Sequence, residues 1–514
     1  PVFRDEHPVQ YRGILYNKRY KFSLRMNMLN QQANQTDLHA WDKDHVWHAF
    51  TQMAEYEPLL IERGEGVYLF DTEGNRYIDG SSSMWCNVHG HRHPRLDAAV
   101  HKQLDKVAHT TNLGLSNPTT TLLAKRLVEI TPEPLAKVFF SSDGSSATEA
   151  ALKMAFQYWQ QSLPLQGDIP QQPAQHRTRF VSLGEAYHGD TLGAIGVGGV
   201  DRFTSIFRPL TFEAIRVPTP GMTASMSPTA DGGPRSDPSS SKTTAAEALS
   251  YLDQLFKQEG NSIAALIMEP LVQAAGGILV HPPGFLKAVR DLTHRHDILL
   301  ILDEIAVGFG RTGTMFACEQ EDVSPDILCL GKGLTAGYLP MAATITTEKV
   351  WENFLGSHKD GRAFYHGHTF GGNPLAAAVA LESLNIFQEE RLLETLRERI
   401  EQLQHLVKKI AQLPHIGDTR QCGLVAGIDL VADKQTGHAY PWENAMGTRT
   451  CLAARQHGAL LRQLGDTVVI MPPLSISSSE LTELLDAVES AIRQTTESTV
   501  SQPPVSQSPN SLVS

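Results

Sequence analysis

The sequence ILLILDE at residues 298–304 decides the fold of this chain. Its run of aliphatic residues predicts a buried strand of the kind found in parallel sheets. The run ends at Asp303 and Glu304, so an acid stands at the carboxyl end of the strand, where open α/β sheets bind ligands. Lys332 follows 29 residues after Asp303, in a glycine-flanked turn. We therefore expect Asp303, Glu304 and Lys332 to mark the functional site.

Other segments alternate between predicted strands and helices, which implies a sheet with helices on both faces. Short apolar runs predict strands at 137–140, 180–183 and 264–268. A glycine- and serine-rich turn precedes a predicted helix, for which Ser146 and Glu149 fit a capping box. The apolar stripe of this helix consists of Ala151, Met154, Ala155, Tyr158 and Trp159. Such a turn presents backbone N–H groups that suit a phosphate dianion, although an ordinary capped helix has the same pattern.

Composition and charge narrow the class of protein. The 514 residues are 41% hydrophobic and 19% charged, enough for a large core and more than one domain. A net charge of -12 argues against nucleic acid or an anionic membrane as the main partner. No apolar stretch approaches the roughly 20 residues of a membrane span. Five scattered cysteines form no metal-ligand spacing, so we predict no metal site and no disulfide framework.

Changes in composition suggest the domain organisation. A stretch rich in Pro, Gly, Ser and Thr at 218–244 predicts a mobile insertion, and the tail has the same character. A long amphipathic helix is predicted over 382–407, joining two domains. The predicted parts are an N-terminal extension without fixed structure (1–40), a first part of a small domain (41–78), a large domain (79–375), a second part of the small domain (376–494) and a disordered tail (495–514).

The motifs around the opening stretch resemble a known family. Asp303-Glu304-Ile305, the glycine-rich residues 308–313 and Gly331-Lys332-Gly333 resemble the signature of the class III aminotransferases of fold type I. The resemblance extends from about Trp47 to about Pro473. It implies an α/β fold with a large, mixed and mostly parallel sheet domain plus a smaller α/β domain.

The resemblance also implies pyridoxal 5'-phosphate (PLP) as cofactor and three catalytic residues. PLP chemistry needs a lysine that holds the aldehyde as a Schiff base and an acid that keeps the ring nitrogen protonated. Lys332 and Asp303 match these two roles. Freed Lys332 would also carry the proton as general base and acid. Tyr187 matches the family's tyrosine that stacks on the ring, although a tyrosine after a strand is often only packing.

Further cofactor contacts carry over by motif. Gly144 and Ser145 match the phosphate cradle, His188 follows Tyr187, and Glu269 resembles the acid near the cofactor's 3-hydroxyl. In this fold type the segment with Gly367, His368 and Thr369 comes from the neighbouring subunit. Thr369 would thus complete the partner's phosphate site, which implies a homodimer with two shared active sites.

The substrate end resembles the subgroup that makes 7,8-diaminononanoate from 8-amino-7-oxononanoate (KAPA) in biotin synthesis. Trp85, Phe50 and Met84 would line a hydrophobic channel, with Gly367 beside it, although such residues are often plain core. Arg462 matches the arginine that binds the KAPA carboxylate, and its alternative is a surface arginine. Phe50 and Met84 stand where users of S-adenosylmethionine carry tyrosine and tryptophan, so the sequence favours L-lysine as donor and leaves S-adenosylmethionine open.

Two competing hypotheses remain. One is another class III aminotransferase, acting on ornithine, acetylornithine or 4-aminobutyrate. The other is a non-catalytic PLP-binding regulator fused to a DNA-binding module, for which the N-terminal segment is too short to hold a helix-turn-helix. We expect a cytoplasmic enzyme with small-molecule substrates and neither nucleic acid nor membrane as partner.

Overall fold

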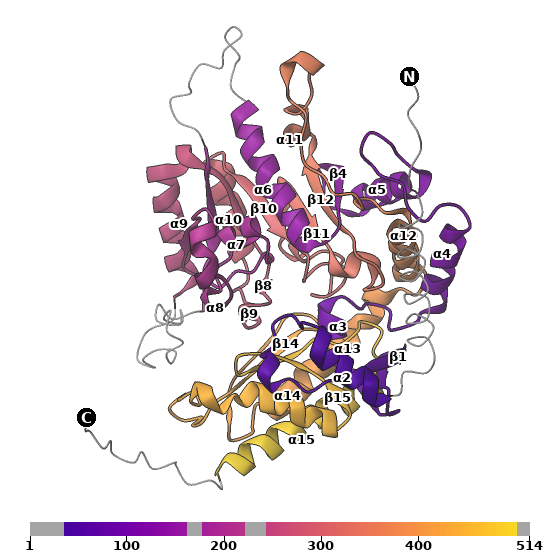
Figure 1. Ribbon diagram of the computed structural model, residues 1–514. Coiled ribbons are helices and arrows are strands. Elements are labelled where there is room, and N and C mark those ends of the chain that lie inside the picture. Colours follow the sequence, from indigo (N-terminus) through magenta and orange to yellow (C-terminus); the bar gives the residue numbers. More distant parts are fainter. Residues whose placement is uncertain (1–34, 162–176, 222–242, 501–514) are drawn as a thin grey trace, which may run out of the picture. The chain divides into compact units, whose positions relative to one another are not determined.

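A computed structural model describes residues 35–161, 177–221 and 243–500 of the chain (Figure 1). The chain divides into two compact units. The first comprises residues up to 64 together with 69–76, and the second comprises 65–68 and the residues from 77 onwards. The domain boundaries predicted at 78/79 and 375/376 stay predictions. In the part of the chain that the structure describes, no helix combines the length and apolarity needed to cross a membrane.

The first unit contains helix α2 (Gln35–His45), the short helix η1 (Met53–Glu55) and most of the strands β1 (Ile61–Glu65) and β2 (Tyr68–Asp71). Asp71 stabilises the turn after β2, because its Oδ1 accepts the backbone N–H groups of Glu73 and Asn75 at 2.9 and 2.8 Å. Of the predicted N-terminal extension, 1–34 lies outside the described residues. Residues 35–40 of the predicted extension belong to α2, so the prediction that they have no fixed structure is wrong.

The second unit is built on a seven-stranded sheet with the order β4-β12-β11-β10-β7-β5-β6. Strands β11, β10, β7, β5 and β6 run parallel to one another, whereas β12 is antiparallel to both β11 and β4. This confirms the predicted mixed, mostly parallel sheet. The strands are β4 (Leu135–Ser141), β5 (Arg179–Leu183), β6 (Ile215–Val217), β7 (Ile263–Met268), β10 (Leu299–Asp303), β11 (Ile327–Leu330) and β12 (Ala342–Thr347).

Both faces of the central strands are buried, as the aliphatic run predicted. Leu300 and Leu302 of β10 belong to one hydrophobic cluster, whereas Leu299 and Ile301 belong to another. Successive side chains of a strand point to opposite faces, so the two clusters lie on the two sides of the sheet. The central strands are therefore sheltered from water, and only their ends can present polar groups to a ligand.

The helices of this part of the chain precede β4, connect strands of the sheet or follow β12. They are α3 (Ser82–Trp85), α4 (Pro94–Leu104), α5 (Pro118–Ile130), α6 (Gly144–Gln161), α7 (Leu192–Val197), α8 (Asp201–Thr204), α9 (Ala245–Glu259), α10 (Phe285–Arg295) and α11 (Glu348–Glu352). The stripe predicted for α6 packs as expected, since Ala151 and Ala155 are fully buried in the second of the two clusters.

A second, antiparallel sheet follows later in the chain, with the order β13-β14-β17-β16. Its strands are β13 (Ile416–Gln421), β14 (Ala426–Leu430), β16 (Arg462–Leu464) and β17 (Thr467–Ile470), and the helices beyond residue 373 are α12 (Pro374–Glu389), α13 (Leu392–Ile410), α14 (Met446–Gln456) and α15 (Ser478–Val500). Two short pairs complete the strands: β15 (Ala459–Leu460) lies parallel to β3 (Arg76–Asp79), and β8 (Val272–Gln273) is antiparallel to β9 (Leu279–Val280).

Local predictions based on sequence pattern fail at three places. The single helix predicted over 382–407 is broken between α12 and α13, where Arg391 adopts a left-handed conformation with φ 51°. A helix commonly ends at a left-handed residue, because the backbone N–H groups at and after that residue bond to carbonyls of the last turn and do not continue the helix. The predicted tail is helical up to the end of α15, and its remainder, 501–514, lies outside the described residues, as does 222–242 of the predicted insertion.

The third failure concerns the start of α6. The carboxylate of Asp143 accepts both the backbone N–H of Ser146, at 3.0 Å, and its hydroxyl, at 2.9 Å. Glu149 instead accepts the backbone N–H of Gly193 at 2.8 Å. The predicted capping box of Ser146 and Glu149 is therefore wrong, because the helix begins three residues earlier than that box requires and Glu149 bonds to Gly193 instead.

Candidate active site

Three polar side chains stand at the ends of neighbouring parallel strands. Asp303 is the last residue of β10, Glu269 follows β7, and Lys332 lies just beyond β11. The register pairs Leu302 with Met268 and Asp303 with Cys329, so the three strands end at nearly the same level. Parallel pairing thus gathers an acid, a second acid and an amine at one edge of the sheet.

Asp303 is buried and held in a fixed orientation. Its Oδ2 lies 2.8 Å from Nδ1 of His188, and its Oδ1 accepts the backbone N–H of Ile305 at 3.0 Å. The His188 side chain is fully buried, and its Nε2 has no hydrogen-bond partner among the residues that the structure describes. A buried polar atom without a partner is unusual in a folded protein. It fits a site that is completed by a bound group.

Glu269 is buried beside this pair. It accepts the backbone N–H groups of Tyr187 at 3.1 Å and of Ala274 at 2.9 Å. Burial raises the pKa of Glu269 to about 7, and the Asp303 carboxylate raises it further, against the opposing effect of His188. The carboxyl group can therefore accept or donate a proton near neutral pH.

Lys332 combines backbone strain with a perturbed amine. Its φ of 40° lies in the left-handed region, in the turn that follows Gly331. Burial lowers the pKa of Lys332, although the charges of Asp303 and Glu269 oppose this. Its Nζ lies 4.9 Å from the centre of the Trp85 ring. A lowered pKa increases the fraction of neutral amine, which is the nucleophilic form.

The predicted phosphate cradle forms a tight backbone corner. Helix α6 begins at Gly144, so its first amides lack partners within the helix. The Ser145 hydroxyl accepts the backbone N–H of Asp190 at 3.1 Å. Gly189 has φ 122°, and a Cβ there would lie 2.1 Å from Oγ of Ser145. The corner thus tolerates no side chain at Gly189 and leaves a concentrated positive dipole for an anion.

Tyr187 and Arg462 lie near each other at this edge. The Tyr187 hydroxyl donates to Oδ2 of Asp190 at 2.7 Å, and burial raises the pKa of the phenol. Burial lowers the pKa of Arg462, while the Cys451 thiol and the Tyr187 phenol oppose that change. Arg462 is half-buried at the start of β16. Its guanidinium is therefore a partly desolvated cation, which suits a carboxylate ligand.

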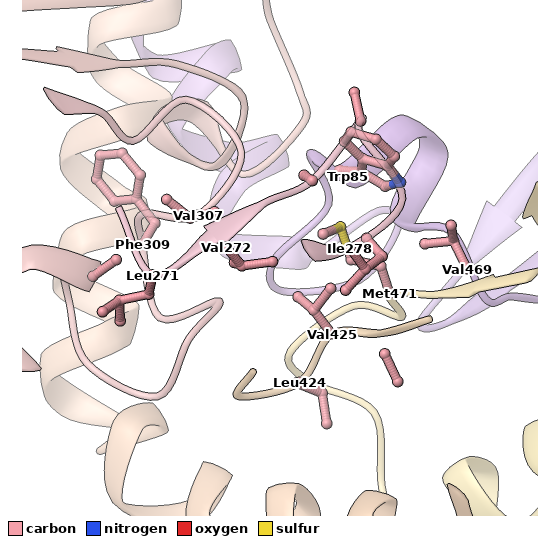
Figure 2. Packing of buried hydrophobic residues seen from close by; sticks show 14 of the residues in the cluster. Trp85, Leu271, Val272, Ile278, Val307, Phe309, Leu424, Val425, Val469 and Met471 are labelled. Carbon is pink, nitrogen blue, oxygen red and sulfur yellow. The ribbon is translucent and has the colours of Figure 1, made fainter. Parts of the chain in front are cut away.

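The residues predicted to bind substrate differ in how far they are buried. Trp85 is buried, and Figure 2 shows it with Ile278, Val469 and Met471, which belong to the same hydrophobic cluster. Met84 is exposed. Phe50 belongs to the first unit, so its predicted contact with substrate stays a prediction.

Gly367, His368 and Thr369 are exposed in the single chain. The His368 ring makes an edge contact with His366, with 5.2 Å between ring centres. The roles predicted for these three residues in a partner's site stay predictions.

Two residues near this site were missed by the sequence analysis. Asp190 lies three residues after Tyr187, yet only the structure shows that it binds the Tyr187 hydroxyl. Cys86 follows Trp85, and its thiol donates to the Ser83 carbonyl at 3.0 Å. The charge of Lys332 lowers the pKa of Cys86, although burial raises it more. Each of the two hydrogen bonds joins residues three positions apart in the sequence.

Comparison with known proteins identifies the family. Residues 51–492 match the family model described as "Aminotransferase class-III". The chain is 47% identical to the adenosylmethionine-8-amino-7-oxononanoate aminotransferase of Geobacter sulfurreducens, over 89% of this chain and 98% of that protein. The crystal structure of the Methanocaldococcus jannaschii protein of the same name superposes with a TM-score of 0.81, at 39% identity, covering 90% of this chain and 99% of that one.

A further solved structure is the ω-transaminase from Pseudomonas jessenii in complex with PMP. It has a TM-score of 0.79 and 29% identity to this chain, and the match covers 90% of this chain and 98% of that one.

Glu304, which opened the sequence analysis together with Asp303, has a structural role. Its two oxygens accept the backbone N–H groups of Ala317 at 2.6 Å and Cys318 at 2.8 Å, in the short helix η4 (Ala317–Glu321). Burial raises the pKa of Glu304 to about 7, although these hydrogen bonds lower it. The folded protein therefore keeps a proton on Glu304 at pH values where the unfolded chain has lost it.

We expect Glu304→Gln to change the pH dependence of stability. Because the folded pKa is raised, the stabilising contribution of the protonated group is present below pH 4.5 and is lost as the pH rises through about 7. The free energy of unfolding of the native protein should thus fall relative to the variant between pH 5 and pH 8, by at most about 3 kcal/mol. Denaturant titrations at both pH values measure this.

Glu321→Gln is the matched control, because Glu321 also accepts two backbone N–H groups, from Gly284 and Lys287, but is only partly buried. Its effect should be the same at both pH values. A constant difference between native protein and Glu304→Gln across this range would contradict the assignment.

Proposed function

The chain belongs to the class III aminotransferases, and we propose that it transfers an amino group to KAPA and so forms 7,8-diaminononanoate. The observation that carries this proposal is the gathering of Lys332, Asp303 and Glu269 at one edge of the sheet, with a half-buried arginine close by. The name of the Geobacter relative, which matches almost the whole chain, supports KAPA as the acceptor. The resemblance of the sequence implies that this reaction belongs to biotin synthesis, and we keep that assignment in the proposal.

The residues at this edge fit PLP, the cofactor of the family. When bound, PLP supplies an electron-accepting ring and an aldehyde that binds amines covalently. Lys332 would hold it, Asp303 would keep its ring nitrogen protonated, and the corner of Gly144 and Ser145 would hold its phosphate. The unpartnered Nε2 of buried His188 and the absence of room for a side chain at Gly189 both agree with a group seated there.

Lys332 carries the proton in the reaction that we propose. Its Nζ takes the proton from Cα of the amino donor, because the lowered pKa leaves a neutral amine as base. Asp303 is held in place by His188 and by the backbone N–H of Ile305, and its carboxylate would keep the ring nitrogen of the cofactor protonated. Arg462 binds the KAPA carboxylate, and the indole of Trp85 covers its apolar chain. Donor and acceptor use one site in turn, so we expect ping-pong kinetics.

Two compounds are candidates for the amino donor. We propose S-adenosylmethionine, because the names of the compared relatives contain it and because the Trp85 ring lies beside the Lys332 amine, where an aromatic face can attract a sulfonium. L-lysine, which Phe50 and Met84 favour, is the second candidate. Its use stays a prediction.

We also propose a homodimer in which Gly367, His368 and Thr369 complete the partner's site. The exposure of these residues supports this, as does the neighbouring Phe370, which is 60% exposed in the single chain. Sedimentation analysis would test it. The cytoplasmic location stays a proposal.

The proposed reaction is tested by incubating the protein with KAPA and each donor separately. We expect 7,8-diaminononanoate to form with S-adenosylmethionine. Turnover with lysine alone would confirm the second donor instead. Rapid turnover of 2-oxoglutarate with ornithine or 4-aminobutyrate, and none of KAPA, would show another class III activity.

Lys332→Ala should abolish the absorbance of the lysine-bound cofactor and lower turnover by orders of magnitude, since the covalent link and the proton carrier disappear together. Asp303→Asn should reduce the rate severely while cofactor binding suffers less. Lys349→Ala, which changes an exposed lysine on α11, is the control. Substantial transamination by Lys332→Ala would refute the assignment.

Arg462→Ala should raise the Michaelis constant for KAPA, with a loss on the order of 2 to 4 kcal/mol in binding, because one partner of a desolvated ion pair is removed. The control is Arg493→Ala, on the exposed face of α15. Initial rates at varied KAPA concentration measure the effect. An unchanged dependence on KAPA would mean that Arg462 does not bind the substrate.

A further inference from the structure

The turn that carries Trp85 has an unusual backbone. Ser82, Ser83, Met84 and Trp85 have φ values of 50°, 46°, 72° and 70°, so four successive residues with side chains are left-handed. Each such residue is disfavoured, because its Cβ crowds the following carbonyl oxygen. Strained backbone persists only where surrounding contacts determine it, and it is concentrated at functional sites. The contacts that hold this turn therefore matter for the site.

The carboxylate of Asp79 is the centre of these contacts. Asp79 is only 1% exposed. Its Oδ1 lies 3.3 Å from both the backbone N and the hydroxyl of Ser81, and its Oδ2 accepts the Ser83 hydroxyl at 2.8 Å. Nε2 of His91 lies 3.0 Å from the same Oδ2. One buried carboxylate thus fixes two residues of the turn region and one histidine.

His91 is itself oriented by a neighbour. Its Nδ1 lies 3.2 Å from the side-chain nitrogen Nδ2 of Asn87. The Nδ1 atom therefore accepts a hydrogen bond from Asn87, and the Nε2–H group donates to Asp79. Burial alone would raise the pKa of Asp79, but the hydrogen bonds from His91 and Ser83 outweigh it and lower the pKa. The carboxylate is therefore ionised and binds its donors strongly.

The turn delivers the Trp85 ring to the reacting amine. The Trp85 backbone N–H donates to the Ser81 carbonyl at 2.8 Å. This bond closes the turn at Ser81, which is one of the residues that Asp79 contacts. From the other side, the Ser82 hydroxyl donates to the Met471 carbonyl at 2.6 Å. The ring centre then lies 4.9 Å from Nζ of Lys332. A change in the turn would move this ring relative to the amine.

We propose that Asp79 and His91 are positioning residues of the active site: they hold the left-handed turn at 82–85 and so fix the Trp85 ring against the Lys332 amine and the bound substrate. The part that concerns substrate rests on the proposed function. The part that concerns the ring and the amine does not. Neither residue touches the reacting atoms, and both act through Trp85.

Asp79→Asn and His91→Ala test this proposal, with His91→Gln as the conservative variant that keeps a donor for Asp79. The matched control is Asp71→Asn. Asp71 is also buried, also ends a strand, and also accepts hydrogen bonds from the turn that follows it. Substitution of either aspartate should lower the melting temperature. Only the substitution of Asp79 should affect the ring of Trp85.

The first measurement is ¹⁹F NMR of the protein labelled with 5-fluorotryptophan, in which the loss of one resonance in Trp85→Phe assigns Trp85. Asp79→Asn and His91→Ala should shift or broaden that resonance, His91→Gln should largely retain it, and Asp71→Asn should leave it unchanged. This measurement needs no substrate, so it stands even if KAPA is not the acceptor.

The second measurement is kinetic. Asp79→Asn should raise the Michaelis constant for KAPA by roughly 10- to 100-fold, as expected for a misplaced substrate wall, with a smaller change in kcat. A native-like Trp85 resonance and Michaelis constant in folded Asp79→Asn would overturn the proposal. Equal effects of Asp71→Asn on both would also overturn it, since they would reflect general stability. If Asp79→Asn does not fold, Ser83→Ala removes one bond from an exposed side chain and should shift both readouts in the same direction.

Discussion

The parallel pairing of β7, β10 and β11 is the constraint on which the rest of the site depends. Because these strands are buried on both faces and share a register, their carboxyl ends meet at one edge of the sheet. Glu269, Asp303 and Lys332 come from distant parts of the chain and become neighbours only through this pairing. A shift of one residue in β10 would turn Asp303 to the opposite face of the sheet.

Burial then sets the chemistry of the gathered groups. Water is excluded, so the pKa of Glu269 rises and that of Lys332 falls, and both move towards neutrality. The opposite charges in the cluster limit these shifts. An amine that is partly neutral, next to a fixed carboxylate, is the combination that amine transfer requires.

Backbone strain is found at the site and in segments between the strands that form it. Left-handed residues with side chains include Trp85 and Lys332, and also Glu185, Leu271 and Phe309, which lie in the segments between the central strands. The Trp85 turn is held by the contacts of Asp79 with Ser83 and His91 and by the bond from Ser82 to Met471. The seven-stranded sheet is a rigid support. Contacts of this kind fix side chains that are carried by irregular backbone and not by a helix or a strand.

The sequence by itself determined the buried strands, the mixed sheet and the family, because aliphatic runs and glycine-rich motifs are local signals. It also identified Asp303 and Lys332, which stand directly beside such signals. Only the tertiary structure decided that Glu149 binds Gly193 and that Glu304 holds a distant short helix. The physical reason is that a carboxylate accepts whichever N–H groups the folded chain brings to it, and their positions in sequence carry no local pattern.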